Sequence, residues 1–111
     1  MEQLNRIELA GRIGTIKITS VGDARIARFS LATNVTYKDK HGTPVIETTW
    51  HNVSAWESPQ CPNLGSLAKG DSVHVIGRIR TSRFTAADGS ERTIYEVVAG
   101  KVERIAADLE F

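Results

Sequence analysis

Two tryptophans on one segment carry the clearest chemical signal in this chain. Residues alternate between polar and apolar types there, so Trp50 and Trp56 have the same parity and face the same side of an extended strand. Asn52 and Ser54 lie between them on that side, and polar neighbours are typical of a surface. The flat faces of exposed tryptophans suit stacking against planar rings such as nucleobases. Spacing alone leaves burial of both tryptophans in a core as the alternative.

Basic residues gather in two stretches without acids, one between Asp23 and Asp39 and the other between Asp71 and Asp88. Cations beside exposed aromatic rings are typical of surfaces that bind single-stranded nucleic acid, because cations neutralise phosphates while rings stack on bases. The formal net charge is only +1, so such a surface has to be local. Ordinary solubilising charge is the alternative. The cations concerned are Arg25, Arg28 and Lys38 in the first stretch and Arg78, Arg80 and Arg83 in the second.

Further aromatic residues accompany these cations. Phe84 has the same parity as Arg80 at the end of an alternating run, and Tyr37 lies next to two lysines at the start of a polar loop. Phe29 has the parity of the apolar residues around it, so it is predicted to lie in the core. Tyr95 is predicted to be a core or interface residue for the same reason.

The elements that must position these residues are β-strands. Gly11 and Gly14 predict a bulge or sharp coiling in the first strand, and Gly100 is a candidate break in the last. Three strands, a short helix and two strands follow the order of the OB fold, a five-stranded barrel, although periodicity alone also allows a sandwich. The class is therefore all-β, with strands predicted over 5–18, 24–37, 45–56, 72–84 and 92–104 and a short helix over 63–69.

Length and composition limit the remaining possibilities. A chain of 111 residues makes one domain, predicted over 1–105, with a short acidic end over 106–111. A single cysteine, Cys61, and no signal-peptide pattern favour a reducing, cytoplasmic setting. The three histidines have no metal-ligand spacing and no catalytic motif is present. We therefore expect no metal, no cofactor and no enzymatic activity.

Five segments, taken together and in order, resemble the bacterial single-stranded-DNA-binding protein family over nearly the whole chain. They are Asn5–Gly14, Phe29–Thr33, Thr49–Val53, Leu67–Asp71 and Val75–Thr81. The resemblance implies an OB fold, assembly as a homotetramer and a place in the cytoplasm at the bacterial nucleoid. It also implies non-catalytic binding and protection of single-stranded DNA, largely independent of sequence, in replication, recombination and repair.

The resemblance also assigns roles to individual residues. His51 matches a histidine at a subunit contact. The family commonly has a basic residue at three positions that are Asn52, Ala68 and Ser82 in this chain. Binding is therefore expected to be weaker or less salt-sensitive than usual. Each lost phosphate contact should reduce the slope of log affinity against log salt by roughly 0.7. The residues expected to bind DNA are the aromatics Tyr37, Trp50, Trp56 and Phe84 and the cations Lys38, Lys40, Lys69, Arg80 and Arg83.

The family normally continues into a flexible tail with an acidic, phenylalanine-ended tip that recruits replication and repair enzymes. Asp108, Glu110 and Phe111 are similar to such a tip, without the usual spacer. A primosomal accessory protein without a tail, acting mainly as a protein-docking dimer, is therefore an alternative. An OB module that binds RNA or oligosaccharide is another, because a fold does not fix its ligand.

Overall fold

The computed structural model describes residues 3–59, 61 and 64–105. Five strands make up nearly all of this part: β1 (Ile7–Val21), β2 (Ala24–Lys38), β3 (Pro44–Trp56), β4 (Ser72–Thr85) and β5 (Glu91–Arg104). One turn of 3-10 helix, η1 (Leu64–Ser66), lies between β3 and β4. The predicted order is confirmed, and the helix is shorter than expected because Gly65 is a poor helix former and Gly70 takes a positive φ of 91°. No helix in the described residues is long and apolar enough to span a membrane.

The strands close into a barrel in the order β1-β2-β3-β5-β4. Neighbouring strands are antiparallel except β3 and β5, which pair in parallel over residues 53–55 and 97–99. A closed five-stranded barrel with a helical turn after the third strand is the OB fold. The closure excludes the sandwich that periodicity left open.

Two bulges give the barrel its sharp coiling. In β1 one extra residue lies between the Ile13–Leu31 and Ile16–Phe29 pairs, in the stretch that contains Gly14. In β4, Ile76 pairs with Lys101 and the next residue, Gly77, pairs with Ala99. Gly100 is therefore the extra residue of a second bulge, in β5. The strand continues through Gly100, where a break was the prediction. Bulges increase local twist, which a small closed barrel needs.

The core fills the inside of the barrel with aliphatic side chains. Phe29 is 4% exposed, which confirms its predicted core position. Tyr95 is 69% exposed, so of its two predicted places the core is wrong, whereas an interface between copies stays a prediction. It lies on β5 beyond the barrel, where only β4 is left to pair with it. The most deeply buried large side chains are those of Leu31, Leu64, Val53, Val73, Val75 and Cys61.

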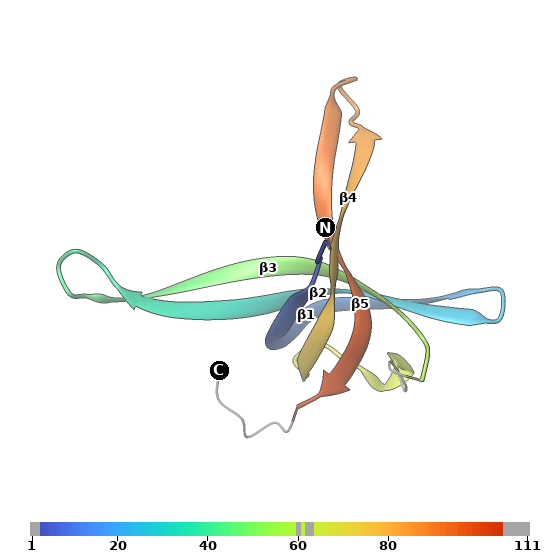
Figure 1. Ribbon diagram of the computed structural model, residues 1–111, viewed down its shortest axis with the longest axis horizontal. Helices are drawn as coiled ribbons and strands as arrows, with labels where there is room; N and C mark the ends of the chain where they lie inside the picture. Colours follow the sequence, from blue (N-terminus) through green and yellow to red (C-terminus); the bar gives the residue numbers. More distant parts are fainter. Residues whose placement is uncertain (1–2, 60, 62–63, 106–111) are drawn as a thin grey trace.

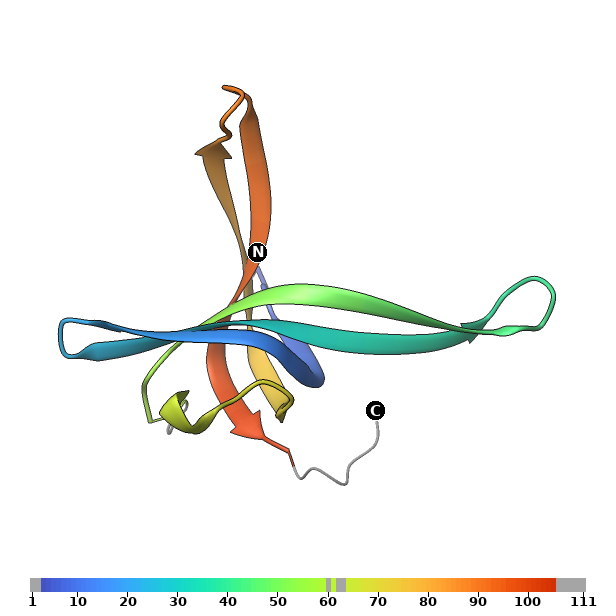
Figure 2. The same ribbon diagram turned by 180° about the vertical axis from the view of Figure 1, so that it is seen from behind.

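Three hairpins extend from the barrel as separate arms (Figure 1). We call them the β1–β2, β2–β3 and β4–β5 arms, and the view from behind shows the same three directions (Figure 2). Each arm turns at a glycine with positive φ, namely Gly22, Gly42 and Gly89. Side chains beyond the barrel contact few neighbours, so the arms expose surface on both of their faces.

Candidate nucleic-acid interface

Trp50 lies on the outside of the barrel, with the outer edge of its ring against Gly14 in the bulge of β1. A Cβ atom added to Gly14 would come within 2.8 Å of Trp50 Cη2, which is too close for two carbon atoms. In this arrangement the indole therefore occupies space that a side chain at position 14 would need. The tryptophan is 60% exposed, so most of its ring is open to solvent.

Trp56 shares the face of Trp50, as its parity predicted. Asn52 lies between them on β3. Val53 and Val97 are register partners on β3 and β5, and both point into the barrel. Successive side chains of a strand point to opposite faces, so the preceding residues, Asn52 and Glu96, both point outwards. Alternation along the β4–β5 ladder then puts Phe84 on this side as well. We call this surface the outer face; it comprises Arg28, Ser30, Trp50, Asn52, Ser54, Trp56, Arg80, Phe84 and Glu96.

Tyr37 and Arg83 do not join the outer face. Tyr37 pairs with Val45 and has the opposite parity to Trp50, so it lies on the other side of the β2–β3 arm. Arg83 pairs with Thr93 and has the opposite parity to Phe84 on the β4–β5 arm. Tyr37 and Phe84 are 47% and 45% exposed, so all four predicted aromatics are accessible although only three share a face.

A hollow of about 310 Å³ lies on the outer face at the root of the β4–β5 arm. Arg28, Ser30 and Asn52 contribute to its lining, and none of them was among the predicted binding residues. The signals were present in the sequence, since Arg28 belongs to an acid-free stretch and Asn52 has the parity of the tryptophans. The full lining is Thr15, Arg28, Phe29, Ser30, Asn52, Ser54, Ile94, Tyr95 and Glu96.

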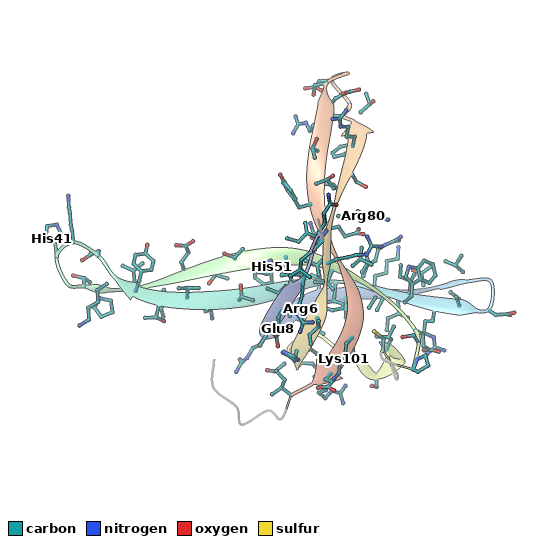
Figure 3. All side chains as sticks on the ribbon, viewed as in Figure 1. Arg6, Glu8, His41, His51, Arg80 and Lys101 are labelled. Carbon is teal, nitrogen blue, oxygen red and sulfur yellow. The ribbon has the colours of Figure 1, made fainter. Side chains whose placement is uncertain are left out.

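The predicted cations differ in how free their charges are. Arg80 Nη2 lies 3.0 Å from Glu96 Oε1, so that carboxylate compensates much of its charge. Among the described residues, no ion pair is found for Lys38, Lys40, Lys69 and Arg83. Arg80 lies near the root of the β4–β5 arm, whereas His41, next to Lys40, lies at the far end of the β2–β3 arm (Figure 3).

His51 lies on the opposite parity to the tryptophans, towards the inside of the barrel. Its Nε2 is 2.9 Å from Thr33 Oγ1, and burial lowers the pKa of the imidazole. Ile7, His51 and Ile79 help to line a second hollow of about 170 Å³. A half-buried, neutral histidine beside apolar side chains fits a packing role better than a catalytic one.

The described residues contain no group of three or more metal-ligating side chains. Cys61 is 1% exposed, and burial raises the pKa of its thiol, which keeps it protonated. A protonated, inaccessible thiol is a poor nucleophile and a poor metal ligand.

An OB barrel with exposed aromatic rings on one outer face, and with cations on its arms that have no ion pair among the described residues, has the parts of a nucleic-acid-binding protein. The chain belongs to the single-strand binding protein family, whose model matches residues 4–105. A single-stranded DNA-binding protein of Neisseria meningitidis is 33% identical over 92% of this chain, and one of Xylella fastidiosa is 34% identical over 92%. The chain spans 60–63% of the length of these curated relatives.

Solved structures agree with the family assignment. The Plasmodium falciparum SSB in complex with ssDNA has a TM-score of 0.77 and 28% identity, with 95% of this chain and 96% of that chain covered. A small single-stranded DNA-binding protein from Streptomyces coelicolor has a TM-score of 0.72 and 27% identity, with 96% and 98% covered. The predicted resemblance and OB fold are thereby confirmed.

Proposed function

We propose that this chain binds and protects single-stranded DNA without catalysis and with little sequence preference, in replication, recombination and repair. The observation that carries this proposal is the outer face, where Trp50, Trp56 and Phe84 are all exposed and have the same parity along their strands. Stacking on such rings is tolerant of sequence because every base has a π face. The names of the relatives and of the similar structures support the binding of single-stranded DNA.

The mechanism combines attraction with stacking. Unpaired cations such as Lys38, Lys40, Lys69 and Arg83 draw in the phosphate backbone. Bases then stack on Trp50, Trp56 and Phe84, each contributing about 1–3 kcal/mol as judged by truncation. Tyr37 lies on the other side of its arm, so it would contact a part of the strand that has already passed around the β2–β3 arm. No metal or cofactor is needed for this binding.

Tryptophan fluorescence tests the proposal directly. We expect strong quenching when the protein is titrated with oligo-dT, and little with a duplex of equal length. Trp50→Ala and Trp56→Ala should each remove part of the quenching and about 1–3 kcal/mol of binding free energy. The titrations should be made at about 50 mM and 200 mM salt, because phosphate contacts weaken with rising salt.

Other outcomes separate the alternatives. No quenching at low salt would contradict the proposal and favour the protein-docking accessory protein. Equal competition by RNA would indicate a general single-strand binder, and competition by oligosaccharide would indicate a sugar-binding OB module. Val75→Ala is a suitable control, because Val75 is buried in the core and should affect stability but not stacking.

We also propose that copies of the chain assemble as a homotetramer, with His51 at a contact between copies. The apolar surroundings of His51, among them Ile7 and Ile79, support a packing role for this region. Sharing one strand among copies raises the effective concentration of each binding surface. The proposed place of action is the cytoplasm, at the bacterial nucleoid. The acidic end with Asp108, Glu110 and Phe111 lies outside the described residues, so docking of repair and replication enzymes there stays a prediction.

A further inference from the structure

Two positive charges face each other directly on the outer side of the barrel. Lys17 of β1 and Arg28 of β2 are register partners in the antiparallel ladder. Side chains directly opposite each other have Cβ atoms about 4.5–5.5 Å apart, and like charges at such positions repel. Both side chains are exposed and extend from the same face of the sheet.

No acid on this face relieves the repulsion. Ser54 is the register partner of Arg28 on the other side, in β3. The neighbours along β1 and β2 on the same face are Thr15, Thr19, Ile26 and Ser30, all uncharged. Among the described residues no ion pair is found for Lys17 or Arg28. Glu96, the acid in the adjoining hollow, is already paired with Arg80 at 3.0 Å.

The pair adjoins a space of suitable size and polarity. Arg28 lines the hollow of about 310 Å³, together with the polar side chains of Ser30 and Asn52. That volume lies near the lower end of the range of roughly 300–1,000 Å³ for small-ligand pockets. Trp50 and Trp56 lie on the same face at either end of this stretch of β3.

We propose that Lys17 and Arg28 together hold one phosphate of the bound strand, while the adjoining hollow receives the attached nucleotide beside Asn52. A phosphate between the two cations would neutralise a repulsion that nothing else in the described structure neutralises. Arginine can also bind a phosphate with two parallel N–H donors. The inference rests on the proposed function, and it adds a phosphate site between the two tryptophans that compensates for the basic positions occupied by Asn52, Ala68 and Ser82.

The test is the salt dependence of oligo-dT binding by full-length variants. Arg28→Ala should weaken binding about tenfold at low salt, as expected for a lost charge-assisted hydrogen bond, and lower the log–log salt slope by about 0.7. Arg28→Lys should keep the slope, because it retains the charge. Arg25→Ala is the matched control: it lies on the same strand with opposite parity, and Glu57 already pairs with Arg25 at 3.7 Å.

A second variant separates binding from folding. Lys17→Glu should raise the Tm of the free protein by about 1–5 °C, because a cross-strand repulsion becomes an attraction. The same variant should weaken oligo-dT binding at least as much as Arg28→Ala does. A purely structural role would not raise stability while lowering affinity.

The outcomes distinguish this inference from the proposed function. If the unmodified protein fails to bind oligo-dT, the proposed function itself is wrong. If it binds, but Lys17→Glu and Arg28→Ala keep its affinity and salt slope, the phosphate site is wrong and the proposed function stands. An equal loss in Arg25→Ala would also overturn the site, because it would indicate a general effect of charge.

Discussion

At the scale of single residues, the position of Trp50 depends on the absence of a side chain at Gly14. The indole covers the bulge of β1, and any Cβ atom there would overlap it. Gly14 has no positive φ, so its requirement is spatial and not conformational. The glycine therefore belongs to the proposed binding surface, although it offers no side chain that could contact a ligand.

Gly14→Ala should displace the ring of Trp50 and cost about 1–3 kcal/mol in the free energy of unfolding, as over-packing does. The same change should reduce fluorescence quenching by oligo-dT. Urea unfolding and a titration of the same sample would measure both effects. Gly100→Ala is the control, because the nearest atom to its added Cβ would be Ile76 O at an ordinary 3.7 Å. Unchanged quenching in Gly14→Ala would show that the bulge does not position Trp50.

At the scale of elements, the β4–β5 arm both offers and restrains positive charge. The pairing of β4 with β5 puts Arg80 opposite Glu96. Both residues lie on the outer face, which also contains Phe84. Arg80 is about half exposed and Glu96 more buried, so the pair is accessible to a competing anion from one side. An exposed ion pair is worth only about 0.2–1 kcal/mol, so a phosphate can replace the carboxylate at small cost.

Glu96→Gln should therefore strengthen binding of oligo-dT, since it frees Arg80 for a phosphate. We expect affinity to rise several-fold at low salt and the salt slope to steepen by about 0.7, with little change in stability. Glu103→Gln is the matched control, because Glu103 pairs with Lys101 at 3.0 Å, and Lys101 lies well away from Arg80 (Figure 3). A weaker binding in Glu96→Gln would mean that the carboxylate orients Arg80 and does not restrain it.

At the scale of the whole molecule, the main prediction concerns the assembly of several copies through the region around His51. The hollow beside His51 contains Glu96 as its acidic lining residue, and that carboxylate is paired with Arg80. Burial lowers the pKa of His51 below its ordinary value of about 6.5, because the charged imidazolium loses contact with water. Packing another copy against this region would bury the imidazole further and favour its neutral form more strongly.

The assembly should consequently be pH-dependent. The unfolded chain binds a proton at His51 more readily than the folded chain, and further burial between copies would widen this difference. We therefore expect assembly to be fully favoured above about pH 6.5 and to weaken as the pH falls below it. Light scattering should give four times the chain mass of 12.2 kDa at about pH 7.5 and a smaller mass near pH 5.5. His51→Gln should remove this dependence, whereas His74→Gln should keep it. A dimer at the higher pH would instead favour the accessory-protein alternative.

The sequence by itself determined the strand order, the place of the turns and the shared parity of Trp50 and Trp56, whereas the exposure of the two rings came from the structure. Alternation and turn residues act over a few neighbouring positions, so they can be recognised without knowing the partners of a strand. The helical segment was predicted longer than the single turn at Leu64–Ser66, because two glycines weaken it. The core alternative for Tyr95 was wrong because its apolar parity continues past the point where the barrel ends.

Only the tertiary structure decided which residues share a surface. Tyr37 and Phe84 both come near the end of a strand that carries basic residues. Strand register puts Phe84 on the same face as Trp50, whereas Tyr37 lies on the other side of its arm. Arg80 appeared free until the ladder brought Glu96 opposite it, and Lys17 gained a role only when β1 was paired with β2. Cross-strand register joins residues far apart in the chain, and a shift of one position reverses every face, so the pattern within a single strand could not reveal these neighbours.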